Sequence, residues 1–270
     1  MNFEKSLRSI SELYKSDKIE HGYIEIYDSY FKQLKNKKLK ILEIGIADGK
    51  SLLTWSDYFK NSIIIGIDIH KINAVEKKLD RENIRIHQGS QSDVKFVNEI
   101  IREYGSFDII IDDGSHLSND VKKSFHLLFP YLNNDGLYAV EDMQTSYNHF
   151  FGGNPFDLKY SNSHMNFFKH LTDSLNYQEI ANPFYIKNKY DSKITNISFY
   201  HNLVFVKKGI NKNESKEVLN HSYEKMKFKV KSDRNGSTLR YYFKYMVLYK
   251  TYTYFLFILN LIKKIILFRF

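Results

Sequence analysis

The sequence contains no cysteine, and this absence excludes several kinds of chemistry at once. Disulfides, thiolate zinc sites, iron–sulfur clusters and cysteine nucleophiles all need that residue. Long apolar runs are also missing: residues 251–262 carry no charge, but this run is shorter than the ~20 residues that span a bilayer. The first residues lack the apolar core of a signal peptide. We therefore expect a cytoplasmic protein without structural disulfides.

Acidic residues are scarce toward the C-terminus. Residues 211–270 carry 13 Lys and Arg against 4 Asp and Glu, whereas the first 210 residues carry 27 of each kind. Such a basic tail points to an anionic partner, either a membrane or a nucleic acid. Its apolar stretch, flanked by lysines, suits an interfacial helix, which would place the protein peripherally on the inner face of the membrane. Packing of the tail on the body or on a second subunit of a homo-oligomer is an equal alternative.

Five short runs rich in Ile and Val alternate with helical patterns. The runs are residues 39–46, 62–69, 83–88, 107–113 and 136–142, bounded by Gly, Asp or Asn. Continuous apolar strands are typical of a parallel sheet covered on both faces. Helices are expected near residues 50–60 and again between the fourth and fifth strands, where Ser118 is the expected N-cap. The alternation predicts a Rossmann-like, doubly wound α/β sheet.

Further elements are expected before and after these five strands. Residues 194–209 are predicted to form a long strand with residues 177–186 as its antiparallel partner, and a helix is expected near residues 160–175. The hairpin would complete a sheet of about seven strands. The sequence thus predicts three parts, which are an N-terminal helical cap (1–35), an α/β domain (36–210) and a basic, aromatic-rich helical tail (211–270).

The turn after the first predicted strand has the features of a cofactor site. Gly45 and Gly49 let the backbone pass close to a ligand, and the helix that follows presents its N-terminus at this point. Asp68 ends the second strand, where a carboxylate can accept hydrogen bonds from ribose hydroxyls. Ligands of open α/β sheets bind beyond the carboxyl ends of the strands. We therefore take these residues as candidate cofactor ligands.

The charge of the turn distinguishes two classes of cofactor. Asp48 lies between the glycines, where its carboxylate would repel the pyrophosphate of a dinucleotide. The same carboxylate suits S-adenosylmethionine (SAM), which has an ammonium group and no phosphate. Glu43 and Asp68 make the pattern more specific than the glycine spacing alone. The alternative is an ordinary α/β turn with solvated carboxylates.

Acidic residues also gather where the fourth and fifth predicted strands end, in DDGSH (112–116) and ED (141–142). Neighbouring strands lie about 4.8 Å apart, so Asp113, Glu141 and Asp142 would converge if these strands are adjacent. Like charges at close range raise one another's pKa, and a divalent cation removes this cost. All-oxygen ligation favours Mg²⁺, with Mn²⁺ or Ca²⁺ as alternatives.

His116 follows Asp113 by three residues in the same loop and is the candidate general base. An imidazole titrates near neutral pH, and an alcohol is a poor nucleophile until its proton is removed. A metal would lower the pKa of the hydroxyl and fix its position. The alternative is a surface loop histidine without a catalytic role.

These motifs resemble the metal-dependent sugar O-methyltransferases of the macrocin and mycinamicin type and their bacterial relatives in polysaccharide loci. The specific part is the pair DDGSH and EDMQTSY, and the similarity runs from about residue 14 to 208. The other matching segments are ILEIGIADGKSL, IIIGIDI, HQGSQSD, FYHNLVFVKKG and YKSDKIEHGYIEIYDSYF (14–31). The basic tail is not part of the family pattern.

The resemblance implies a class I methyltransferase that binds SAM and a divalent metal. It implies that SAM is surrounded by Glu43, Gly45, Asp68 and the loop Gly89, Ser90 and Gln91; Asp48, Gly49 and Asp112 complete our set of candidate cofactor residues. It implies Asp113, Glu141 and Asp142 as metal ligands and His116 as the base. Ser90 departs from the family, which usually has an acidic residue there, and this puts adenine recognition by the Ser90 side chain in doubt.

The expected reaction is Mg²⁺-dependent transfer of a methyl group from SAM to a hydroxyl of a sugar. The sugar would belong to a polysaccharide, a glycolipid or a glycosylated natural-product precursor. One alternative is a methyltransferase that acts on RNA or another non-sugar substrate through the basic tail, and another is a non-catalytic adaptor with this fold. Nucleic acid is the less favoured partner, because the metal residues have no obvious role in most nucleic-acid methylation.

Overall fold

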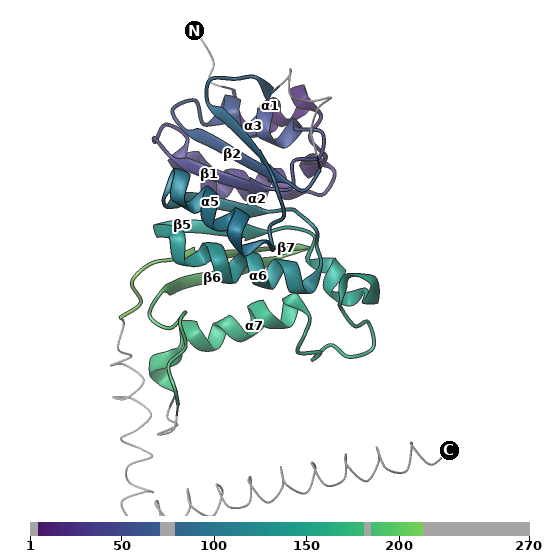
Figure 1. The fold of residues 1–270 in the computed structure, drawn as a ribbon, viewed down its shortest axis with the longest axis vertical. Helices are drawn as coiled ribbons and strands as arrows, with labels where there is room; N and C mark the ends of the chain where they lie inside the picture. The colour runs from purple at the N-terminus through teal and green to yellow at the C-terminus, as the bar shows by residue number, and fades with distance from the viewer. Residues whose placement is uncertain (1–4, 71–78, 181–184, 213–270) are drawn as a thin grey trace, which may run out of the picture. The chain divides into compact units, whose positions relative to one another are not determined.

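The computed structural model describes residues 5–70, 79–180 and 185–212. Seven strands form one sheet in the order β3-β2-β1-β4-β5-β7-β6, in which β1 to β5 are parallel and β7 is antiparallel to β5 and β6 (Figure 1). The strands are β1 (Lys40–Ile44), β2 (Ile63–Asp68), β3 (Ile84–Gln88), β4 (Phe107–Asp112), β5 (Leu132–Val140), β6 (Ile194–Tyr200) and β7 (Leu203–Lys208). The strand order reverses between β1 and β4, which is where doubly wound sheets bind ligands. The predicted Rossmann-like sheet is confirmed.

Helices cover both faces of the sheet (Figure 1). One face carries α1 (Leu7–Tyr14), α2 (Tyr23–Phe31) and α3 (Lys50–Tyr58), and the other carries α5 (Val94–Tyr104), α6 (Ser118–Leu128) and α7 (His164–Leu175). Short 3₁₀ helices are η1 (Asp17–Ile19), η2 (Lys32–Leu34), η3 (Phe129–Tyr131), η4 (Met143–Tyr147), η5 (His149–Phe151) and η6 (Tyr177–Glu179). Alternate strand residues face opposite layers, so that Ile41 joins the first core and Leu42 the second.

Aromatic packing fixes the N-terminal cap on the sheet. Tyr27 of α2 makes edge-on contacts with the rings of Trp55 on α3 and Phe205 on β7, at centroid distances of 5.3 and 5.4 Å. Phe31, one turn further along α2, contacts Trp55 and Phe59 in the same manner. All five side chains are buried, and each such pair contributes about 0.5–1.5 kcal/mol beyond its buried area. The cap is therefore held firmly enough to present polar groups to the sheet edge.

Two local expectations are wrong. The chain turns at His201 and Asn202, so both strands of the hairpin come from the predicted long strand, and its expected partner begins instead with the 3₁₀ helix η6. Asn202 has φ 59°, a left-handed conformation that asparagine tolerates. Leu117, not Ser118, is the N-cap of α6. The Ser118 hydroxyl pairs with His164 Nδ1 at 3.0 Å, and this buried contact takes the place of a cap hydrogen bond.

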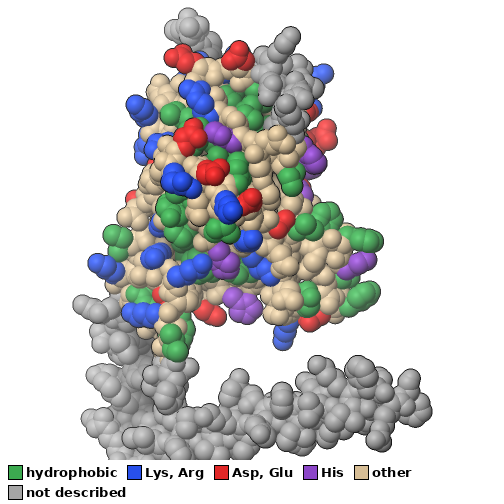
Figure 2. Space-filling view, in the orientation of Figure 1, with side chains coloured by type: hydrophobic (Ala, Val, Ile, Leu, Met, Phe, Trp, Pro, Cys, Tyr) green, Lys and Arg blue, Asp and Glu red, His purple; other side chains and the backbone are tan. Residues whose placement is uncertain are grey.

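The predicted basic tail lies almost wholly outside the described residues, which end at 212. Basic and acidic side chains are interspersed over the described part of the surface in Figure 2, in keeping with the equal numbers of the two kinds in the first 210 residues. No helix in the described ranges has both the length and the apolar character needed to cross a membrane.

Candidate active site

A cavity of about 490 Å³ opens at the carboxyl edge of the sheet, where the strand order reverses. Nine of the candidate residues line it, namely Gly45, Asp48, Asp68, Gly89, Ser90, Gln91, Asp113, His116 and Asp142. Glu43, Gly49, Asp112 and Glu141 are not among the lining residues. The structure therefore brings most of the candidate residues to one cavity, and leaves four of them off its wall.

The turn after β1 owes its shape to Gly45 and Asp68. Gly45 has φ 86°, and a Cβ atom built there would lie 2.1 Å from the backbone oxygen of Asp113, so only glycine lets β1 and the loop after β4 approach each other. Asp68 Oδ2 accepts hydrogen bonds from the amides of Ile46 and Ala47, at 2.8 and 3.3 Å. The Asp68 carboxylate therefore shapes the turn while it faces the cavity.

Replacing Gly45 with alanine is expected to destabilise the protein more than the same change at Gly22. Both glycines have positive φ, which costs an alanine about 1–2 kcal/mol, but a Cβ at Gly22 would have no heavy atom within 4 Å. Gly22→Ala therefore isolates the conformational cost, and Gly45→Ala adds a backbone clash. Urea unfolding followed by circular dichroism measures both changes. Equal losses in the free energy of unfolding would show that the loop after β4 moves away at little cost.

Asp48 lies at the rim of the cavity. Its carboxylate forms an ion pair with Lys50 Nζ at 2.5 Å, and its side chain is 56% exposed. From the sequence, this carboxylate is expected to pair with the ammonium group of SAM. The structure gives it a cation from the protein, so that a ligand ammonium would share the carboxylate with Lys50.

Gln91 connects the loop after β3 to the loop after β4. Its amide nitrogen donates to Asp112 Oδ1 at 2.9 Å, and its amide oxygen accepts from the backbone nitrogen of Ser115 at 2.8 Å. Burial raises the pKa of Asp112 to about 6, against the opposing hydrogen bonds of Ser124 and Gln91. Asp112 is thus buried, and it supports the cavity wall through Gln91.

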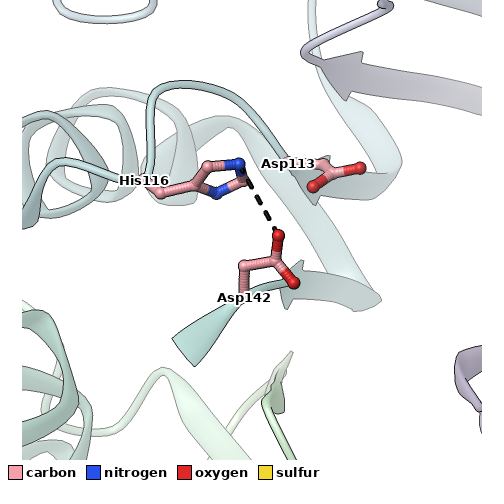
Figure 3. Close-up of side chains that lie close together, drawn as sticks. All are labelled: Asp113, His116 and Asp142. Atoms are coloured by element: carbon pink, nitrogen blue, oxygen red, sulfur yellow. Dashed lines mark ion pairs between the residues drawn. The ribbon is translucent and has the colours of Figure 1, made fainter. Parts of the chain in front are cut away.

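Asp113, His116 and Asp142, which all line the cavity, lie close together (Figure 3). One ligand atom from each residue lies within 4.8 Å of the other two, and His116 Nε2 is 3.7 Å from Asp142 Oδ2. His116 and Asp142 have φ values of 56° and 53°. Non-glycine residues held in this conformation are strained and cluster at functional sites.

Glu141 lies deeper, within a buried group of charges that centres on Lys18. The Lys18 ammonium is 2.7 Å from Asp113 Oδ2, 2.7 Å from Glu141 Oε1 and 3.6 Å from Glu43 Oε1. Burial lowers the pKa of Lys18, but the three carboxylates outweigh it and hold this pKa well above its ordinary value. Burial and the nearby Asp113 raise the pKa of Glu141 to about 8. The lysine stays charged and partly neutralises the carboxylates.

The donor set fits a hard divalent cation. Three carboxylates, those of Glu43, Asp113 and Glu141, face a single buried ammonium, and the carboxylate of Asp142 lies close to that of Asp113. The four leave a strong excess of negative charge when they are ionised. Carboxylate oxygens at the cavity edge are the ligands that Mg²⁺ prefers. Asp113 and Asp142 reach this point from adjacent strand ends, with Glu141 directly behind them.

Sequence reasoning missed three residues of this site, Lys18, Tyr23 and Tyr27. Tyr27 Oη donates to Glu141 Oε1 at 2.6 Å, and Tyr23 Oη donates to Asp142 Oδ1 at 3.0 Å. The segment at residues 14–31 stood out in the sequence only as a whole. The four-residue spacing of the two tyrosines, which places them on one face of α2, was the signal that could have singled them out.

Comparisons with known proteins identify the family of the chain. Residues 42–143 match the family Methyltransf_24, described as a methyltransferase domain. The chain is 37% identical over 199 residues to mycinamicin VI 2''-O-methyltransferase of Micromonospora griseorubida, covering 71% of this chain and 49% of that protein. It is 36% identical to demethylmacrocin O-methyltransferase of Streptomyces fradiae, with the same coverage of the two chains. The chain spans about half the length of the curated relatives it matches.

Solved structures give the same result. MycE, the methyltransferase of the mycinamycin biosynthetic pathway, in complex with Mg and SAH matches with a TM-score of 0.76 and 33% identity, over 86% of this chain and 60% of that chain. A complex of MycE with Mg, SAH and mycinamycin VI matches with a TM-score of 0.72 and 35% identity, over 78% of this chain and 55% of that chain. By sequence and by structure, the chain is a homologue of the sugar O-methyltransferases of the mycinamicin and macrocin type.

Proposed function

We propose that the protein transfers a methyl group from SAM to a hydroxyl of a sugar, in a reaction that needs a divalent metal. The observation that carries the proposal is the convergence of Asp113, His116 and Asp142 in a cavity at the carboxyl edge of the sheet. The relatives are named as O-methyltransferases, and a further one from Streptomyces olivaceus, 32% identical over 199 residues, is named for a rhamnosyl tetracenomycin, which supports the same reaction here.

SAM would occupy the part of the cavity lined by the turn after β1 and the loop after β3. Gly45 lets the ligand approach the backbone, and Asp68 at the end of β2 stands where ribose hydroxyls are bound in this fold. When bound, SAM supplies an electrophilic methyl group on a sulfonium. The two loops hold it beside the residues that receive the acceptor.

Asp113, Glu141 and Asp142 are the proposed metal ligands. A bound Mg²⁺ would lower the pKa of an acceptor hydroxyl and fix its position. Asp113 and Asp142 line the cavity, and Glu141 lies behind them with Lys18 and Tyr27 on one of its oxygens. This arrangement supports ligation by one oxygen from each carboxylate.

His116 is the proposed general base. It accepts the proton of the acceptor hydroxyl as the oxygen attacks the methyl carbon, and the bond from that carbon to sulfur breaks to leave S-adenosylhomocysteine. Asp142 Oδ2 lies 3.7 Å from His116 Nε2, so the proposed base stands directly beside the proposed metal ligands. The 24% exposure of the His116 side chain leaves a path for the proton to solvent.

We further propose that the acceptor sugar is attached to an apolar group. Phe151 lies beside His116, with ring centroids 6.5 Å apart, and the neighbouring Phe150 is 78% exposed. An aromatic side chain beside the proposed base, followed outward by an exposed one in the same short helix, suits an aglycone or lipid better than a polysaccharide. Of the three acceptor classes expected from the sequence, a glycolipid or a glycosylated natural product is therefore favoured over a polysaccharide.

Tritiated-methyl transfer from SAM tests the function directly. Alkyl glycosides, nucleotide sugars and RNA are offered as acceptors, each with Mg²⁺ or with EDTA. Glycosides should be labelled only with the metal, since the metal acidifies and orients the hydroxyl. Full labelling in EDTA would refute the metal requirement. Labelling of RNA without any labelling of sugars would favour the nucleic-acid alternative.

A further inference from the structure

Building on the proposed metal centre, we propose that Tyr23 and Tyr27 of the N-terminal cap are positioning residues that orient its carboxylate ligands. The cap holds one particular oxygen of each carboxylate. Tyr27 Oη donates to Glu141 Oε1, and Tyr23 Oη donates to Asp142 Oδ1. Lys18, also from the cap, donates to Glu141 Oε1 and to Asp113 Oδ2.

Each of the three carboxylates thus has one oxygen anchored by the cap. The second oxygens, Oδ1 of Asp113, Oε2 of Glu141 and Oδ2 of Asp142, receive none of these hydrogen bonds. The Oδ2 atom of Asp142 is the one that faces His116. A carboxylate held in this way offers a single oxygen in a fixed direction. Mg²⁺ demands near-ideal octahedral geometry, and so it gains most from ligands that are oriented before it binds.

The Tyr27 hydroxyl is not needed to fill the core, whereas the Tyr23 hydroxyl also lies 3.2 Å from the backbone oxygen of Asn202, in the turn between β6 and β7. The Tyr27 ring packs among Phe31, Trp55 and Phe205, and phenylalanine would fill the same space. Burying a hydroxyl is costly unless it is hydrogen-bonded, and both hydroxyls meet this need on adjacent carboxylates. Since Tyr23 and Tyr27 are one helical turn apart on α2, their hydroxyls match the consecutive residues Glu141 and Asp142.

Metal affinity tests this proposal, and the tyrosine variants Tyr23→Phe and Tyr27→Phe remove only one oxygen atom each. Mn²⁺ binding is measured by electron paramagnetic resonance in the presence of S-adenosylhomocysteine. Loss of such outer partners typically weakens metal binding about 10–100-fold, and we expect a change of this size in each variant. Lys18 is unsuitable for the test, because its charge opposes the cation while its hydrogen bonds orient the ligands.

Tyr30→Phe is the matched control. Tyr30 is on the same helix, and its hydroxyl pairs with that of Tyr200 at 3.0 Å instead of a carboxylate. It should bind Mn²⁺ like the wild type, and Tyr27→Phe and Tyr30→Phe should unfold at similar temperatures in EDTA. Tyr23→Phe also loses the hydrogen bond to the backbone oxygen of Asn202, so Tyr27→Phe is the cleaner test. Wild-type Mn²⁺ affinity in Tyr23→Phe and Tyr27→Phe would overturn the positioning role while leaving the proposed function intact. A wild-type protein that binds no Mn²⁺ would overturn the metal centre itself.

Discussion

Replacing His116 with asparagine is expected to slow methyl transfer by about 10²–10⁴-fold, the usual contribution of a general base. Asparagine is a better choice than alanine, because residue 116 has φ 56° and asparagine tolerates the left-handed conformation. The variant should keep the backbone of the loop and lose the group that accepts the proton. Single-turnover methyl transfer with saturating SAM and Mg²⁺ measures the effect on the chemical step.

His126→Asn is the matched control, since His126 lies on α6, packs against Tyr190 and is not a residue of the cavity wall. It should turn over at the wild-type rate. Binding of S-adenosylhomocysteine to the His116 variant, measured by calorimetry, should also be unchanged. A His116→Asn protein with a normal single-turnover rate would mean that the hydroxyl loses its proton to water or to a neighbouring carboxylate.

The part of the site that follows from strand ends could be predicted from the sequence. Parallel strands place their carboxyl ends at one edge, so a carboxylate after β4 and another after β5 must lie close together once those strands are neighbours. The glycine turn follows from the same rule, because Gly45 comes directly after β1. Local patterns therefore sufficed for Asp113, His116 and Asp142.

The contribution of the cap could not be predicted in this way. Lys18 is 95 residues from Asp113 and 123 from Glu141 in the sequence, and no local pattern indicates contact over such separations. A lysine is also expected at the surface, since lysine is almost never fully buried unless it is paired. Its burial follows from the carboxylates it meets. Lys18 lies on η1, between α1 and α2, and it reaches these carboxylates through the packing of the cap helices on α3 and β7.

The hairpin was misplaced for a different reason. Apolar residues continue on both sides of the turn at His201 and Asn202, and the turn contains neither glycine nor proline. The pattern therefore indicates one strand where the structure has two. The positive φ of Asn202 closes the turn, and asparagine is a weaker signal for such a turn than glycine.

Replacing Asp113 with asparagine is expected to weaken metal binding by at least about 100-fold, because loss of an outer partner already costs about 10–100-fold and this change removes a charged ligand. The shape of the side chain is kept. Lys18 retains its contact with Glu141 at 2.7 Å, so the buried ammonium keeps a counter-charge and the fold should persist. Methyl transfer should fall in parallel at low Mg²⁺ and recover partly as Mg²⁺ is raised, since mass action refills a weakened site.

Asp108→Asn provides the control from the same strand. Asp108 lies near the start of β4, away from the cavity, where its carboxylate accepts hydrogen bonds from the backbone nitrogen of Lys40 at 2.8 Å and from the side chain of Asn133 at 2.7 Å. This variant should lose some stability and keep the wild-type affinity for Mn²⁺. The two affinities are compared by the same spectroscopic titration. If Asp113→Asn bound Mn²⁺ as tightly as Asp108→Asn, the carboxyl edge of β4 would not be part of a metal centre, and the proton of the acceptor would have to be removed without one.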